Sequence, residues 1–181
     1  MNNCKAVFTP LVHNEKLQKE DGSGEADASQ YRSLIRSILY LTTTRPDIIY
    51  ATSLLLRFMQ KPSQKYYTAA RRILRYLQDT KGCRIYYTFT DDPKLLGYTD
   101  NDWAESIDDL KSTSGYAFML GSSVFSWALN KQKIVAQSST EAEYLATANA
   151  TSQAIWLRKM FENIGENKKN QQLCCTTASQ Q

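Results

Sequence analysis

The chain has 181 residues, a length that suits one domain or one domain with a helical appendage. Lys and Arg total 22 and Asp and Glu total 18, and the resulting net charge of +4 permits a polyanionic partner without demanding one. Hydrophobic residues make up 42% and charged residues 22%, which argues against a wholly disordered protein. The sequence shows neither an apolar run of the ~18 residues that a membrane span needs nor an N-terminal signal-peptide core. We expect an intracellular protein, cytoplasmic or nuclear, without a membrane partner.

The reactive side chains narrow the chemistry further. His13 is the only histidine and lies in a polar stretch, and the four cysteines show no CxxC spacing. These features argue against a Ser-His-Asp or Cys-His catalytic system, a zinc ribbon and a thioredoxin-like pair. If the protein catalyses a reaction, carboxylates must carry it.

The first part of the chain is a polar lead followed by a helical region. The stretch 18–29 is rich in Gly, Ser and acidic residues and lacks an apolar period, so we expect residues 1–28 to be disordered or extended. Apolar residues then recur with helical spacing in three stretches between residues 29 and 81. This pattern predicts a helical unit over 29–81, with Pro46 in the first turn of its second helix.

The pattern changes at residue 82. β-Branched and aromatic residues predict strands over 84–90, 95–99, 115–120 and 124–128. A long helix follows, with Ser139 or Thr140 as its N-cap and its end near Asn163, and Glu143 completes a capping box with Thr140. A short strand begins at residue 173. The whole pattern predicts an α+β fold, and the inward positions expected on the long helix are Tyr144, Leu145, Ala148, Ile155, Leu157 and Phe161.

Two acidic residues are candidates for catalysis. Asp100 ends an apolar strand and is close to Asp102, an arrangement that can hold a divalent cation at the edge of a sheet. Glu141 lies in the first turn of the long helix, where the helix dipole favours a carboxylate. The alternatives are a solvated acidic turn for Asp100 and an ordinary N-terminal helix residue for Glu141. A two-metal site built on this pair would need further carboxylates from other elements.

Basic residues gather on the third predicted helix. Lys65, Arg71, Arg72 and Arg75 are interleaved with tyrosines, a composition that suits binding to a nucleic-acid backbone. The alternative is a solvated helix face. The loop 130–133 is also modestly basic, and we interpret it as a solvated strand end.

Five segments, read in order, carry a family resemblance: YRSLIRSILYLTTTRPDIIYATSLLLRFMQKPS, AARRILRYLQDTKG, GYTDNDWAES, KSTSGYAFMLGSSVFSWALNKQKIVAQSSTEAEY and QAIWLRKM. They resemble the C-terminal part of copia-type long-terminal-repeat retrotransposon Pol polyproteins, and the resemblance extends through Met160. In that family this stretch joins the end of the reverse transcriptase to ribonuclease H. Ribonuclease H cleaves RNA in RNA–DNA hybrids with Mg²⁺.

The resemblance implies a fold and a site. It implies a helical reverse-transcriptase connection over 29–81 and a ribonuclease H-like domain over 82–175, built as a mixed sheet with one long helix. Asp100 matches the family's first catalytic Asp and Glu141 matches its helix Glu, so both are expected to be catalytic and to bind metal. The cofactor would be Mg²⁺ or Mn²⁺. The partners would be an RNA–DNA hybrid or other nucleic acid, and the rest of a Pol polyprotein.

The sequence departs from the family on its last strand. There the family has Cys-Asp-Asn, then Ser-Ala, and that Asp is the third catalytic carboxylate. This chain has no Asp or Glu after Glu166, and the family's later helix and fifth strand are missing too. We therefore expect an incomplete, marginally stable ribonuclease H-like domain with weak metal binding and weak or absent cleavage alone. The tail 176–181 fits the hypothesis of a frameshift.

Two other hypotheses remain open at this stage. One is a nucleic-acid-binding module that uses the basic helix without catalysis. The other is a translated retroelement remnant that does not fold.

Overall fold

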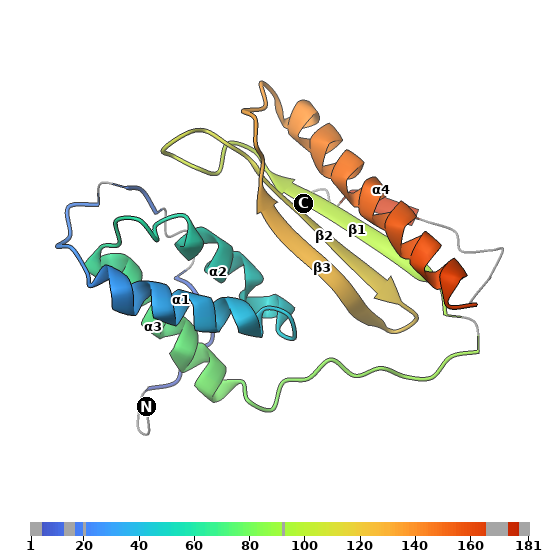
Figure 1. Cartoon of the computed structure of the whole chain (residues 1–181), viewed down its shortest axis with the longest axis horizontal. Helices are drawn as coiled ribbons and strands as arrows, with labels where there is room; N and C mark the ends of the chain where they lie inside the picture. Colours follow the sequence, from blue (N-terminus) through green and yellow to red (C-terminus); the bar gives the residue numbers. More distant parts are fainter. Residues whose placement is uncertain (1–4, 13–16, 20, 92, 166–173, 178–181) are drawn as a thin grey trace. The chain divides into compact units, whose positions relative to one another are not determined.

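The computed structural model describes residues 5–12, 17–19, 21–91 and 93–165, together with the backbone of 174–177. The chain divides into two compact units, residues 1–83 and 84–181. The expectations for His13 and for tail residues 178–181 lie outside the described residues. The first unit contains α1 (Ala28–Leu41), η1 (Pro46–Ile48), α2 (Ile49–Leu56) and α3 (Gln64–Asp79) (Figure 1). The second contains β1 (Leu95–Asp102), β2 (Thr113–Leu120), β3 (Ser123–Lys131), α4 (Ser139–Asn163) and β4 (Cys174–Thr177).

The helices of the first unit pack their apolar faces into one core. Tyr31 is fully buried, and its hydroxyl donates to the backbone oxygen of Leu55 at 2.8 Å. Burial raises the pKa of Tyr31. The rings of Phe58 and Tyr66 stack with their centroids 4.1 Å apart. The other buried apolar residues of this core include Ile35, Ile38, Ile48, Ala70 and Ile73.

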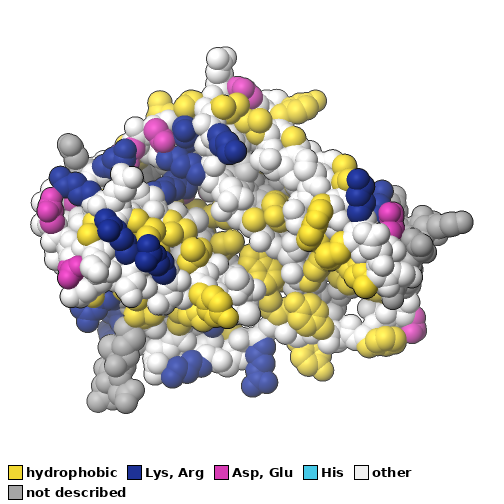
Figure 2. Space-filling view, viewed as in Figure 1, with side chains coloured by type: hydrophobic (Ala, Val, Ile, Leu, Met, Phe, Trp, Pro, Cys, Tyr) yellow, Lys and Arg dark blue, Asp and Glu magenta, His cyan; other side chains and the backbone are white. Residues whose placement is uncertain are grey.

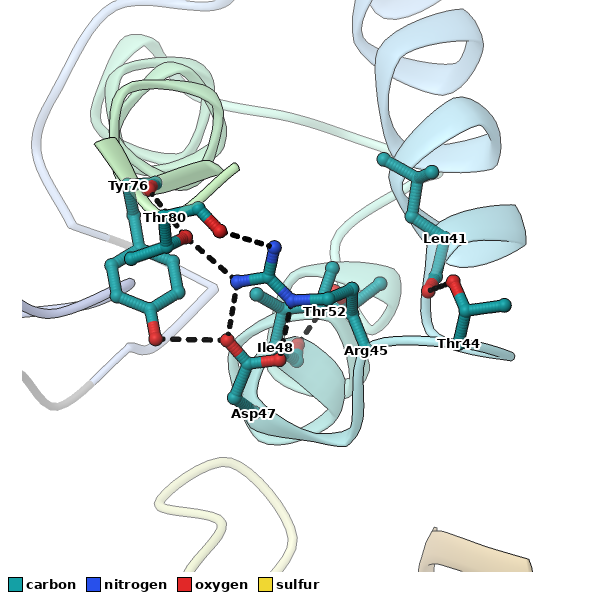
Figure 3. A network of polar contacts seen from close by, with 8 residues as sticks. All are labelled: Leu41, Thr44, Arg45, Asp47, Ile48, Thr52, Tyr76 and Thr80. Carbon is teal, nitrogen blue, oxygen red and sulfur yellow. Dashed lines mark hydrogen bonds and ion pairs between the residues drawn. The ribbon is translucent and has the colours of Figure 1, made fainter. Parts of the chain in front are cut away.

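A polar network joins the start of η1 to the end of α3 (Figure 3). Arg45 Nε and Nη2 donate to the two carboxylate oxygens of Asp47, at 2.9 and 2.7 Å. Nη1 and Nη2 of the same guanidinium also donate to the backbone oxygen and the hydroxyl of Thr80, at 3.2 and 2.7 Å. The Tyr76 hydroxyl donates to Asp47 at 2.8 Å. Helices distant in sequence are thereby tied together by charge-assisted hydrogen bonds.

The described parts of the lead contact the helical unit. Leu11 is buried in its core, with 8% of its surface exposed. The backbone N–H of Ala26 donates to the oxygen of Pro62 at 3.0 Å, and the N–H of Gln64 donates to the oxygen of Gly24 at 2.8 Å. Residues 24–26 thus run along the chain segment that enters α3.

The second unit is a four-stranded mixed sheet in the order β3-β2-β1-β4. β1 is antiparallel to β2, with Asp102 opposite Thr113, and parallel to β4, with Thr99 opposite Thr177. The long helix α4 runs beside β1 in the opposite direction (Figure 1). The predicted α+β class, with a mixed sheet and one long helix, is confirmed.

The strand predicted over 84–90 is wrong. This segment has no regular secondary structure, and Phe89 is 92% exposed. It is held to the β2–β3 hairpin through side chains instead. The Tyr87 hydroxyl donates to the oxygen of Val124 at 2.9 Å, and Thr88 bonds through its N–H and hydroxyl to the hydroxyl of Ser122. β-Branched and aromatic composition predicted a strand here, but the segment forms no backbone ladder.

Helix α4 packs on the sheet through alanines rather than large side chains. Its buried positions are spaced by four residues and end at Leu157: Ala142, Ala146, Ala150 and Ala154. The predicted inward positions are wrong for Tyr144 and Ile155, which are 77% and 51% exposed, and for Ala148, which is also exposed. Small side chains let the helix axis approach the sheet closely, and such a face has little apolar contrast in the sequence.

Gly97 is matched to a ring on the neighbouring strand. It lies opposite Phe118 in the β1–β2 pairing, and Phe118 is fully buried against Ala154 and Leu157 of α4. A Cβ atom at position 97 would lie 2.7 Å from the Phe118 ring. The glycine therefore makes room for the central aromatic residue of this core.

Candidate functional site

Asp100 is exposed near the end of the central strand β1, opposite Gly115 of β2. Side chains alternate along a strand, and the neighbouring positions Gly97 and Thr99 are buried on the face that α4 covers. Asp100 therefore points to the other face. Its Oδ1 accepts a hydrogen bond from the backbone N–H of Asn101 at 2.8 Å.

The carboxylates coupled to Asp100 belong to the same end of β1. Burial, and then the negative charges of Glu105 and Asp100, raise the pKa of Asp102. Thr113, which lies opposite Asp102, donates its hydroxyl to Glu105. The charges of Asp100 and Glu105 therefore act on the carboxyl of Asp102.

Glu141 supports the start of α4. The N-cap is Ser138, whose hydroxyl accepts from the N–H of Glu141 at 3.2 Å. Glu141 Oε2 in turn accepts from the backbone N–H of Gln137 at 2.7 Å. The predicted capping box of Thr140 with Glu143 is wrong by two residues. Ser138 precedes Glu141 by the same three-residue spacing, two residues earlier in the chain, but Glu141 accepts from the N–H of Gln137, the residue before the N-cap, rather than from that of the N-cap itself.

The two predicted carboxylates come from elements that share one end of the unit. The first turn of α4 and the last residues of β1 lie at that end (Figure 1). Asp100 points to the sheet face that α4 leaves open, whereas Glu141 belongs to the helix on the opposite face. In the described ranges, no three His, Cys, Asp or Glu side chains come close enough together to hold a metal ion. The roles of Asp100 and Glu141 in catalysis and metal binding stay a prediction.

The four predicted nucleic-acid-binding residues lie on α3 but differ in their surroundings. Arg71 is exposed, and Arg75 is half-buried. Arg72 donates from Nε and Nη2 to the backbone oxygen and hydroxyl of Thr9, at 3.1 and 3.0 Å. Of the four predicted residues, Arg72 is therefore hydrogen-bonded to the N-terminal lead, through Thr9. In Figure 2, Lys and Arg side chains spread over the surface of the helical unit, with acidic side chains among them.

Lys65 also faces the lead. A hydrogen bond from Ser63, and to a smaller extent the charge of Lys65, lower the pKa of Asp21. Ser63 is the N-cap of α3 and donates to Asp21 at 2.6 Å. Nearby, Lys61 pairs with Glu25 at 3.4 Å. Asp21 and Glu25 of the lead thus lie near Lys65 in the first turn of α3 and Lys61 just before it, and the role of Lys65 in nucleic-acid binding stays a prediction.

The loop after β3 contains a residue that sequence reasoning missed. Asn130 and Lys133 are exposed, as expected for a solvated strand end, but Gln132 is only 7% exposed, so the interpretation of 130–133 is wrong at Gln132. Lys131 pairs with Asp109 at 2.7 Å. Burial opposes the ionisation of Asp109, but hydrogen bonds from Lys131 and Ser106 outweigh it and lower the pKa of Asp109 to about 2. The large apolar residues of β3, Phe125, Trp127 and Leu129, alternate out of phase with Gln132, so the sequence pattern gave no signal that Gln132 is buried.

Comparison with known proteins gives close similarity over most of the chain. The retrovirus-related Pol polyprotein from transposon RE1 of Arabidopsis thaliana is 40% identical over 165 residues, which cover 91% of this chain. The corresponding polyprotein from transposon TNT 1-94 of Nicotiana tabacum is 37% identical over 186 residues, covering 99% of this chain. The chain spans 11% and 14% of the lengths of these two polyproteins.

A shorter relative matches differently. The secreted RxLR effector protein 161 of Plasmopara viticola is 43% identical over 128 residues, which cover 70% of this chain and 90% of that protein. No protein-family model matches the chain, and no solved structure does. In the part of the chain that the structure describes, none of the helices has the length and apolar character needed to cross a bilayer.

Proposed function

This chain belongs to the copia-type family of retrotransposon Pol polyproteins, and from that premise we propose that it is a ribonuclease H portion of such a polyprotein, unable to cleave alone. The substrate class is RNA paired with DNA, and the expected partner is the rest of the polyprotein. Asp100 and Glu141 are the two carboxylates of the family's site that we assign to this chain.

The pairing of β4 with β1 carries the proposal. The strand that lies parallel to β1 reads Cys174 to Thr177 and contains no acidic residue. We align the family's Cys-Asp-Asn with Cys175-Thr176-Thr177 and therefore assign the place of the third carboxylate to Thr176. Thr176 lies opposite Tyr98, two residues before Asp100. A neutral residue thus stands beside the strand of Asp100 where the family has its acid.

The residues present do not fit a complete metal site. Two divalent ions held by carboxylates can stabilise both the attacking and the leaving oxygen of a phosphodiester. Here Asp100 and Glu141 each accept a backbone hydrogen bond, and Asp100 points to the sheet face that α4 leaves open, whereas Glu141 belongs to α4 itself. Fewer carboxylates compensate less cation charge, so we propose weak binding of Mg²⁺ or Mn²⁺.

The decisive experiment restores the missing acid. The natural chain and the Thr176→Asp variant are incubated with a labelled RNA–DNA hybrid and Mg²⁺ or Mn²⁺. We expect no cutting by the natural chain, metal-dependent cutting of the RNA strand by the variant, and loss of that cutting in Thr176→Asp combined with Asp100→Asn. Thr177→Asp is the matched control, since it adds the same charge one residue away.

Each other outcome has a definite meaning. Cutting by the natural chain that Asp100→Asn abolishes would contradict inactivity and show that the existing carboxylates suffice. A folded Thr176→Asp variant without cutting would contradict the assignment of Thr176. A circular-dichroism melt without a cooperative transition would instead favour a remnant that does not fold.

The second candidate function is nucleic-acid binding without catalysis through α3. The observation that favours it is the exposure of Arg71 on the helix that also carries Lys65, Arg72 and Arg75. Phosphate contacts of this kind give affinity that falls as salt rises. Hybrid binding with a steep salt dependence, and no gain of cutting in Thr176→Asp, would favour this function over the first.

A further inference from the structure

Gln132 connects three elements at the end of the sheet where α4 begins. It follows the last residue of β3, and its backbone N–H donates to the oxygen of Ser112 at 2.8 Å, next to the start of β2. Its side-chain Nε2 donates to the hydroxyl of Ser114 on β2 at 2.6 Å and to the backbone oxygen of Ala142 on α4 at 3.0 Å. With 7% of its surface exposed, the side chain is almost fully enclosed.

The other half of the same amide is left without a partner. Gln132 Oε1 is buried and makes no hydrogen bond, and neither does the buried Oδ1 of Asn101. Asn101 lies opposite Ser114, the residue whose hydroxyl Gln132 binds, in the β1–β2 pairing. An unpartnered buried oxygen is unfavourable, and an apolar side chain of similar length would avoid it. The two donated hydrogen bonds are therefore the contribution that a glutamine makes at this position.

The hydrogen bond from Gln132 to Ala142 affects the position of Glu141. Ala142 follows Glu141 in the first turn of α4, and its buried side chain faces the sheet. Anchoring the Ala142 oxygen to β2 fixes the axial position and rotation of this turn relative to the β1–β2 pair. The cap formed by Ser138 and Glu141 holds the turn to the preceding loop, whereas in the described residues the Gln132 amide connects it to the sheet.

We propose that Gln132 is a positioning residue, which sets the first turn of α4, and with it Glu141, against the end of the β1–β2 pair. The part of this inference that concerns Glu141 chemistry rests on the proposed function. The part that concerns the placement of the turn does not.

The test replaces Gln132 with methionine, which keeps the length and removes both donors. Gln137→Met is the matched control, since Gln137 is exposed in the same loop and keeps the backbone N–H that Glu141 accepts. Amide hydrogen exchange of the purified full chain is followed by residue. In Gln132→Met, we expect the amides of Glu141 and Ala142 to exchange about tenfold faster, the change expected from losing one net hydrogen bond. The amides around Ala150, in the middle of α4, keep their rates.

A purely structural role predicts a different pattern. It would speed the exchange of amides throughout the second unit by one common factor, because only global unfolding would be affected. That pattern, or wild-type rates at Glu141 and Ala142 in a folded Gln132→Met chain, would overturn the proposal.

A second readout uses the restored background. In the Thr176→Asp chain, adding Gln132→Met is expected to lower kcat about tenfold with KM for the hybrid unchanged, because binding through other surfaces remains. An equal kcat with and without Gln132→Met would contradict the role for Glu141. If Thr176→Asp has no activity at all, the proposed function fails, while the exchange measurement still decides the placement of the turn.

Discussion

Arg45 and Asp47 form a doubly hydrogen-bonded ion pair across the single proline that separates them, and the same guanidinium reaches Thr80, 35 residues further along the chain. The pair is partly enclosed, with 16% and 34% of the side chains exposed. One local contact at the start of η1 thereby also fixes the end of α3.

Asp47→Asn should destabilise the first unit by about 1–2 kcal/mol. The neutral amide cannot accept two charge-assisted hydrogen bonds, and it leaves the half-buried guanidinium without its counter-charge. All three tryptophans, Trp103, Trp127 and Trp156, lie in the second unit. Thermal unfolding followed by far-ultraviolet circular dichroism should therefore shift, while the tryptophan fluorescence transition stays in place. Asp79→Asn, on the exposed end of α3, is the control, and an equal shift in it would contradict the prediction.

The same carboxylate predicts acid sensitivity of the first unit. Burial alone would raise the pKa of Asp47, but hydrogen bonds from Arg45 and Tyr76 outweigh it and lower the pKa. The folded chain then binds fewer protons than the unfolded chain. Its contribution is fully present above the unfolded pKa of ~3.9 and is lost as the pH falls through the folded pKa. Between about pH 5 and about pH 3, the stability of the first unit should fall more steeply in the natural chain than in Asp47→Asn. Equal losses of stability in the two chains would contradict this prediction.

Gly97→Ala should destabilise the second unit by about 1–3 kcal/mol, since the added methyl group meets the fully buried Phe118 ring. Tryptophan fluorescence during urea unfolding measures the effect. Adding Phe118→Leu gives the methyl group room, so the double variant should lose less than the sum of the two single variants. Strict additivity would show that the ring is not the obstacle.

Glu141 has a structural role that can be separated from its charge. Glu141→Ala should cost about 0.5–1 kcal/mol, because the bond from the Gln137 N–H to Glu141 is lost, whereas Glu141→Gln keeps an accepting oxygen and most of the stability. Glu143→Ala, at an exposed position of the same turn, is the control. If Glu141→Ala and Glu143→Ala melt alike, the capping role is wrong.

The basic face of α3 can be tested with two neighbouring arginines. Arg71→Gln should weaken hybrid binding and reduce the salt slope by about 1, as expected for one lost phosphate contact. Arg72→Gln should change binding less, because its guanidinium is already bonded to Thr9. Fluorescence anisotropy over a series of KCl concentrations measures both. A larger effect at Arg72 would mean that the lead releases this residue when nucleic acid binds.

Sequence periodicity predicted the elements that depend on local pattern. The long helix was predicted to begin after an N-cap at Ser139 or Thr140 and to end near Asn163, within one or two residues of its bounds in the structure, and the helical unit began within a residue of α1. The prediction of a strand over 84–90 was wrong because a strand needs a neighbouring strand to pair with, and composition does not show whether one is adjacent. The buried face of α4 was not predicted, because its alanines are only weakly apolar compared with the exposed Tyr144 and Ile155.

In the candidate site, too, local sequence features were predictable and contacts between distant residues were not. Residue type and helix position were enough to single out Asp100 and Glu141. That Asp100 points to the sheet face that α4 leaves open depends on the β1–β2 register, in which a shift by one residue would exchange the faces. Gln132 acts through Ser114 and Ala142, partners 18 and 10 residues away, and no local pattern specifies such contacts.

The parallel placement of β4 also sets an order for folding during synthesis. β1, β2 and β3 are consecutive antiparallel strands, so they can pair as soon as residue 131 leaves the ribosome. The outer edge of β1 pairs only with residues 174–177, after the whole of α4 has been made. At about 5–20 residues per second, the nascent chain spends seconds with that edge unpaired. Interruption of translation in this interval would release a chain whose central strand is open to pairing with another copy.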